Sequence, residues 1–136
     1  MSRRRFEEWF ERRIQRRFER VGCVVINAAR SRPVDLIVFP PSAKASTPWP
    51  SHPIFVELKA RRSNSPRGQE EMQRGLAEAA GVNWIRIRQA HPRGHIRVEA
   101  CQTAPPDDES CLASLMNIAF GDLWRPAEKQ DDTHVS

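Results

Sequence analysis

Two short apolar runs, DLIVF at 35–39 and IFVELK at 54–59, most tightly constrain how this chain can fold. Both have the length and the β-branched and aromatic content of strands, and a loop with five prolines at 40–53 separates them. Segments with helical periodicity precede and follow the two runs, at 4–21 and 66–80. This order of elements predicts an α/β fold with a mixed central β-sheet flanked by helices.

The segment 4–21 has the pattern of an amphipathic helix, and Gly22 ends it. Its apolar residues share one face: Phe6, Phe10, Ile14, Phe18 and Val21. Glu11 falls at the edge of that face, where a carboxylate must be neutralised, paired or bound to a metal unless it bends out to solvent. The opposite face carries an outward-facing aromatic residue and several arginines: Trp9, Arg5, Arg12, Arg16 and Arg20.

The same periodicities predict further strands and a further helix. Strands are expected at 23–28, 83–88 and 96–100, and a last amphipathic helix at 110–124. Ser65 and Pro66 have the residue types of an N-cap and first helical position, and Gly81 closes the helix that they begin. The spacing i, i+3, i+7, i+10 predicts one inward stripe on this helix, formed by Gln69, Met72, Leu76 and Ala79.

The length of 136 residues predicts one domain, which we divide into a main part at 1–104, a helix at 105–124 and a disordered polar tail at 125–136. No apolar run is long enough to span a membrane, and the Arg-rich start lacks the apolar core of a secretory signal. Three cysteines without a CxxC pair favour a cytoplasmic location and no structural zinc.

The charge of the chain is distributed unevenly. Its net charge is +5, with +10 on residues 1–100 and −5 on residues 101–136. A basic body suits a polyanion such as nucleic acid, although an Arg-rich composition alone has the same effect. Only three of the 22 basic residues are lysines, and one of them is Lys59.

Lys59 belongs to a Glu-x-Lys sequence at the end of the second apolar run. Residues i and i+2 of a strand share a face, so Glu57 and Lys59 lie about 6–7 Å apart, with Ile54, Val56 and Leu58 on the other face. Asp35 opens the first run. Asp35 and Glu57 together could hold Mg²⁺ or Mn²⁺, and Lys59 could act on the attacking water or the phosphate. Taken alone, Glu-x-Lys also fits the alternating edge of a solvated strand.

With these motifs, residues 6–90 resemble the small stand-alone phage and bacterial members of the VRR-NUC family, within the PD-(D/E)xK nucleases. PVDLIVFP resembles the family's PD strand, FVELKA its central motif, and Gln69 its helix glutamine. Glu11, with Gly22 eleven residues later, resembles its first-helix glutamate pattern. Val34 separates Pro33 from Asp35, which departs from the family pattern, and the long 40–53 loop is a second departure.

The resemblance implies a restriction-endonuclease-like fold and a bacterial or phage-encoded enzyme that hydrolyses DNA. It implies metal binding by Glu11, Asp35 and Glu57, and catalytic roles for Asp35, Glu57, Lys59 and Gln69. It further implies a homodimer acting on branched DNA such as Holliday junctions, with no nucleotide cofactor. Seven arginines are expected to contact the DNA: Arg12, Arg16, Arg30, Arg32, Arg61, Arg62 and Arg67.

Two other functions remain open from the sequence. One is a nucleic-acid-binding or regulatory module that keeps the fold without cutting. The other is an interaction protein that uses Trp9, Trp84 and Trp124 at interfaces. The absence of GxSxG, Walker A and GxGxxG sequences leaves hydrolase-elbow, NTPase and dinucleotide-binding functions without support.

Overall fold

The computed structural model describes residues 2–28, 34–41, 49–60, 68–103 and 108–126. The helix start expected at Ser65 and Pro66 lies outside them. The elements, in chain order, are α1 (Arg3–Arg20), β1 (Val24–Asn27), β2 (Leu36–Phe39), β3 (Ile54–Ala60), α2 (Gln69–Ala80), β4 (Asn83–Gln89), β5 (Ile96–Gln102), α3 (Asp108–Phe120), the 3-10 turn η2 (Gly121–Leu123) and β6 (Trp124–Pro126).

The described strands form one mixed sheet of six strands in the order β1-β2-β3-β4-β5-β6. β1, β2 and β3 are joined by antiparallel pairs, β3 and β4 are parallel, β4 and β5 are antiparallel, and β5 and β6 are parallel. The predicted mixed α/β architecture with flanking helices is therefore confirmed.

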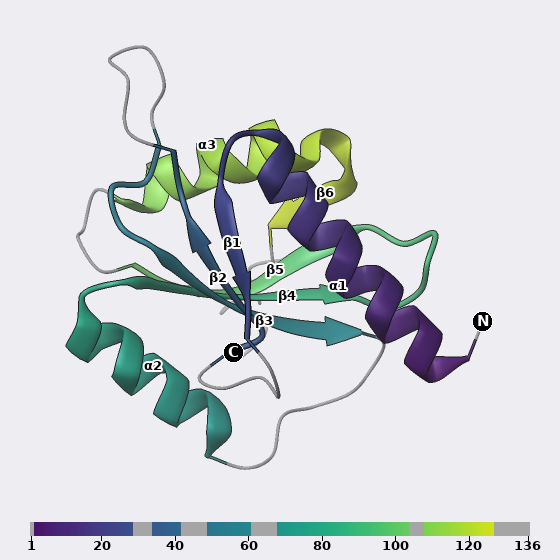
Figure 1. Cartoon of the computed structure of the whole chain (residues 1–136), viewed down its shortest axis with the longest axis horizontal. Coiled ribbons are helices and arrows are strands. Elements are labelled where there is room, and N and C mark those ends of the chain that lie inside the picture. Colours follow the sequence, from purple (N-terminus) through teal and green to yellow (C-terminus); the bar gives the residue numbers. More distant parts are fainter. Residues whose placement is uncertain (1, 29–33, 42–48, 61–67, 104–107, 127–136) are drawn as a thin grey trace, which may run out of the picture.

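α1 and α3 cover one face of the sheet and α2 covers the other (Figure 1). The larger core lies under α1 and α3, where Phe6, Phe10, Ile14 and Phe18 are almost completely buried, as the helical periodicity predicts. The Phe18 and Phe120 rings meet edge to face at 5.2 Å, which joins α1 to α3. Ser2 accepts a hydrogen bond from the backbone N–H of Arg5 at the start of α1.

α2 packs on the opposite face with a different stripe from the one that the sequence predicts. Gln73 and Ala77 are buried, whereas Met72 is 57% exposed and Leu76 is 46% exposed. The predicted inward stripe is therefore wrong. The physical reason for the different stripe lies in the surface beneath the helix, which is polar as well as apolar. Glu57 and the indole N–H of Trp84 lie there, and Gln73 forms hydrogen bonds with both.

The three tryptophans considered for an interface are each half-buried or buried in the structure. Trp84 is fully buried, so its proposed place at a surface interface is wrong. Trp9 is half-buried against the Phe6 ring rather than fully outward. Trp124 belongs to β6, a strand that the sequence does not predict, and its indole N–H donates to Asn117 at 2.7 Å.

The strands expected at 83–88 and 96–100 are confirmed, and they form the antiparallel hairpin of β4 and β5. Gln89, the last residue of β4, donates to the carbonyls of Pro92 and Gly94 in the connecting turn. Among the described helices, none has the length and the apolar character that crossing a bilayer would demand.

Candidate metal and phosphate site

The site begins where β2 and β3 lie side by side. Leu36 pairs with Val56 in the antiparallel register, and Asp35, one residue before Leu36, continues that register beside Glu57. The Asp35 carboxylate accepts a hydrogen bond of 2.7 Å from the backbone N–H of Leu58 and is also hydrogen-bonded to the Glu57 carboxyl. The fold therefore brings Asp35, which precedes the long loop, into direct contact with Glu57 of the Glu-x-Lys sequence, which follows the loop.

Glu57 is only 2% exposed, and its surroundings change its acidity. Burial raises the pKa of Glu57 to about 8; the hydrogen bond to Asp35 and the negative charge of Asp35 contribute to the rise, while Gln73 and Lys59 oppose it. Two carboxyl groups this close hold a shared proton more readily than two charges. At neutral pH and without a cation, Glu57 is therefore largely protonated.

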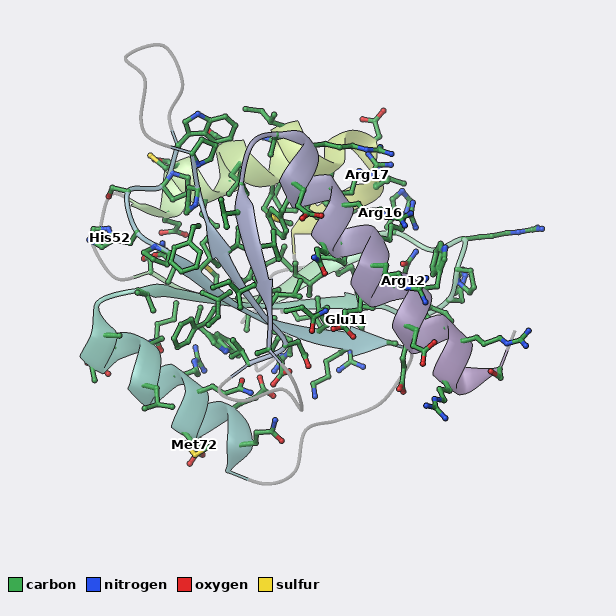
Figure 2. The ribbon with its side chains drawn as sticks, in the orientation of Figure 1. Glu11, Arg12, Arg16, Arg17, His52 and Met72 are labelled. Atoms are coloured by element: carbon green, nitrogen blue, oxygen red, sulfur yellow. The ribbon has the colours of Figure 1, made fainter. Side chains whose placement is uncertain are left out.

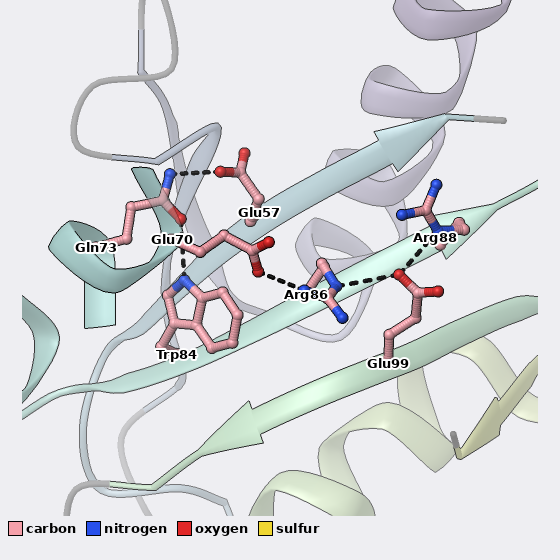
Figure 3. A network of polar contacts seen from close by, with 7 residues as sticks. All are labelled: Glu57, Glu70, Gln73, Trp84, Arg86, Arg88 and Glu99. Atoms are coloured by element: carbon pink, nitrogen blue, oxygen red, sulfur yellow. Dashed lines mark hydrogen bonds and ion pairs between the residues drawn. The ribbon is translucent and has the colours of Figure 1, made fainter. Parts of the chain in front are cut away.

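Gln73 links this pair to the core on the α2 side. Its amide N–H₂ donates to Glu57, and its amide oxygen accepts from the Trp84 indole N–H at 3.2 Å (Figure 3). Both ends of the Gln73 amide group thus help to fix the Glu57 side chain. Gln69 begins α2 one turn earlier on the same side of the helix and is half-exposed.

Lys59 and two arginines extend the site along the same face of the sheet. In the parallel register Glu57 pairs with Arg86 and Lys59 pairs with Arg88, and Lys59 is 8% exposed. Arg86 bonds both Glu70 of α2 and Glu99 of β5, and Arg88 bonds Glu99 at 2.8 Å (Figure 3). Two arginines and two glutamates thus form an ion-pair network beside Lys59, in which their charges offset one another.

Glu11 approaches the pair from α1. Its side chain turns toward β3, as Figure 2 shows, and it accepts a 2.6 Å hydrogen bond from the Asn27 amide. The same Asn27 amide lies 3.4 Å from the Gln15 amide oxygen. Partial burial raises the pKa of Glu11; the bond from Asn27 lowers it, and the negative charges of Asp35 and Glu8 raise it.

The donor set suits a hard cation. The buried Glu57 and the half-buried Asp35 lie in contact, a third acid approaches from α1, and carboxylate oxygens are the ligands that Mg²⁺ and Mn²⁺ prefer. In the part of the chain that the structure describes, no three or more His, Cys, Asp or Glu side chains already stand close enough together to hold an ion. The arrangement supplies a ready pair of ligands, Asp35 and Glu57, with Glu11 nearby.

The structure brings together Glu11, Asp35, Glu57 and Lys59 from the residues proposed on sequence grounds. Of the seven arginines expected at DNA, Arg12 and Arg16 lie on the outer side of α1. The other five lie outside the described residues: Arg30, Arg32, Arg61, Arg62 and Arg67.

Sequence reasoning missed several residues that contact or flank the pair: Gln73, Asn27, Arg86 and Arg88. A usable signal existed for the first, since Gln69, Gln73 and Ala77 recur at i, i+4, i+8. A second signal was the alternation of Arg86 and Arg88 on the strand expected at 83–88.

Comparison of the chain with protein-family models finds no match, and no curated protein matches it.

Proposed function

We propose that this protein is a metal-dependent endonuclease that hydrolyses phosphodiester bonds in DNA. The observation that carries the proposal is the contact of the half-buried Asp35 with the buried Glu57, with the buried Lys59 two residues further along the same strand face. Two neighbouring acids lower the stability of a fold. A role in binding a cation would explain why this chain has them side by side. A basic body of +10 over residues 1–100 favours a polyanionic substrate.

In this proposal Asp35 and Glu57 hold Mg²⁺ or Mn²⁺, and Glu11 completes the set from α1. When bound, the ion would lower the pKa of a coordinated water and offset charge on the attacked phosphate. The chain's own residues prepare this site. The Leu58 N–H orients Asp35, Gln73 orients Glu57, and Asn27 orients Glu11.

Lys59 has a separate role in the proposed reaction. Its ammonium group shares the Glu57 face of β3, where it can stabilise the negative charge that develops on the phosphate or orient the attacking water. Gln69, at the start of α2, is the residue that the family resemblance assigns to assistance; Gln73 is the glutamine that contacts Glu57. We assign the positioning of Glu57 to Gln73.

The test is cleavage of linear, nicked, flapped and four-way DNA with Mg²⁺ or Mn²⁺. Lys59→Ala should lower kcat by about 10²–10³-fold, the usual cost of losing one charge-stabilising group. Glu57→Ala should abolish cutting, whereas Glu78→Ala, an exposed glutamate on α2, should retain it. Equal cutting by the wild type and both site variants would overturn the site, and no cutting of any substrate by the wild type would overturn the activity.

A second candidate is a nucleic-acid-binding module that does not cut. It is favoured by the finding that the described residues contain no preformed group of three possible metal ligands. Binding in EDTA separates the two functions. Asp35→Asn should bind DNA more tightly if the acids face the phosphate, and unchanged affinity would favour a binding module whose acids lie elsewhere.

The proposed partners are branched DNA and a second copy of the chain. β1 is an edge strand of the described sheet without a charged residue, and Val24 and Ile26 are 64% and 48% exposed on it, beside Phe39. Such an edge can pair with the same strand of a second copy. Light scattering should report a dimer that Ile26→Lys dissociates, and an unchanged mass would exclude this contact.

A further inference from the structure

A basic groove runs along the outer side of α1, away from the carboxylate site. Its volume is about 640 Å³. Its lining comes entirely from α1: Arg5, Glu8, Trp9, Arg12, Arg13, Arg16, Arg17 and Arg20. We call this surface the α1 groove. From Arg5 to Arg20 it extends about 22 Å, at 1.5 Å per helical residue.

The charge of the α1 groove is largely uncompensated. Its acid, Glu8, lies 3.4 Å from Arg4 and 3.9 Å from Arg12. Among the described residues, no carboxylate lies within ion-pair distance of the remaining groove arginines: Arg5, Arg13, Arg16, Arg17 and Arg20. Unpaired cations packed along one helix repel one another, which a folded chain tolerates at a cost in stability.

In the α1 groove, Trp9 is packed against both Arg13 and Phe6. The Arg13 guanidinium lies 5.1 Å from the centroid of the Trp9 ring, and the ring packs edge to face on Phe6. Burial and the neighbouring charge of Arg17 lower the pKa of Arg13. A stacked arginine keeps its outward N–H groups available for an anion, because stacking uses only the face of the guanidinium plane.

The α1 groove and Glu11 lie on opposite sides of the same helix. At 3.6 residues per turn, Trp9, Arg16 and Arg20 are about 140–180° around the axis from Glu11. Figure 2 shows this separation, with Glu11 toward β3 and Arg12, Arg16 and Arg17 on the far side of α1. Because a helix with side chains is about 10–12 Å wide, a phosphate in the groove cannot be the phosphate held beside Glu11.

We propose that the α1 groove binds the phosphate backbone of a nucleic-acid segment other than the one that is cut. The proposal rests on the proposed nuclease function and names a property of its substrate: two stretches of backbone that pass on either side of α1. A linear array of arginines fits regularly spaced phosphates, which arginine grips in bidentate fashion. An anionic membrane is a poorer fit, because Trp9 is the only apolar side chain among the described residues that line the groove.

Binding of a labelled four-way DNA in EDTA, measured against salt, tests the α1 groove without any cleavage. Arg16→Gln and Arg17→Gln should each lower the slope of log affinity against log salt by about 1, as expected for the loss of one phosphate contact. Arg4→Gln is the matched control. It removes the same charge from the same helix, at a residue outside the groove that is already paired with Glu8. Unchanged slopes for both groove variants would overturn the proposal, and so would a loss for Arg4→Gln as large as theirs.

Kinetics then distinguish the groove from the site. With a cleaved substrate, Arg17→Gln should raise KM and leave kcat unchanged, because the lost contact is made equally before and during the reaction. A fall in kcat at constant KM would place the arginine at the reacting phosphate and overturn the proposal. If the wild type cuts nothing, the nuclease function fails while the EDTA measurement still decides whether the groove binds DNA.

The same variants should separate nucleic acid from other polyanions. Binding to phosphatidylserine vesicles and to polyglutamate should be weaker than binding to DNA of equal charge concentration. A loss by Arg16→Gln and Arg17→Gln that appears with vesicles or polyglutamate but not with DNA would overturn nucleic acid as the occupant.

Discussion

Replacing Glu57 with glutamine should remove a pH dependence from the stability of the metal-free protein. The pKa of Glu57 rises from the ordinary 4.5 to about 8 in the fold, chiefly through burial. Between those values the folded protein binds a proton that the unfolded chain has released, so its stability falls as the pH rises. Each tenfold change in proton affinity corresponds to about 1.4 kcal/mol, and the loss between pH 4.5 and 8 is at most about 5 kcal/mol.

The sign of this effect is opposite to that of an ordinary salt-bridged carboxylate. Stabilisation by the protonated Glu57 is complete below pH 4.5 and is lost as the pH rises through about 8. Glu57→Gln preserves the shape of the protonated acid and can still bond Asp35 and Gln73, but it cannot ionise. Its stability should therefore lack this decline.

Urea denaturation in EDTA at about pH 5, 6, 7 and 8 measures the effect. The free energy of unfolding of the wild type should fall relative to that of Glu57→Gln across this range, and Glu78→Gln, at an exposed position on α2, should follow the wild type. Parallel curves for the wild type and Glu57→Gln would refute the argument, since they would show that the buried carboxyl group has an ordinary pKa.

Three further predictions concern the site and the core. Gln73→Leu should raise the pH needed for Mg²⁺ binding, because Gln73 lowers the pKa of Glu57; a shift to lower pH in calorimetric titrations would contradict this. Glu11→Gln should weaken Mg²⁺ binding by about 10–100-fold, whereas Glu8→Gln on the outer side should leave it unchanged; equal effects in the same titrations would remove Glu11 from the site. Phe18→Ala should cost about 3–5 kcal/mol in urea unfolding, because its ring is completely buried; a loss below about 1 kcal/mol would show that this core is loosely packed.

The parts of the fold that the sequence predicts are those governed by local periodicity. The buried face of α1 follows from a 3.6-residue repeat, and Gly22, with φ of 97°, ends the helix as expected because other residues rarely adopt that conformation. The alternation in β3 correctly separates Glu57 and Lys59 from Ile54 and Val56. Each of these depends only on neighbours in the chain.

The missed features depend on partners distant in the sequence. α2 turns Gln73 rather than Met72 inward because Glu57 and Trp84 offer hydrogen bonds that no local pattern encodes. β6 is three residues long and exists because β5, more than twenty residues earlier, offers a free edge. The sequence indicates Asp35 and Glu57 as a pair, but the raised pKa of Glu57 depends on burial and strand register, which no local pattern encodes.

The chain of bonds from Glu57 through Gln73 to Trp84 gives the protein an internal optical reporter. Trp84 is the most deeply buried of its tryptophans in the described structure, and its indole N–H is tied to the same amide that holds Glu57. A change in charge on Glu57 alters the field at that indole and should shift its fluorescence. Titration with acid or with a cation can thus be followed in the unlabelled protein, with Trp84→Phe identifying the signal.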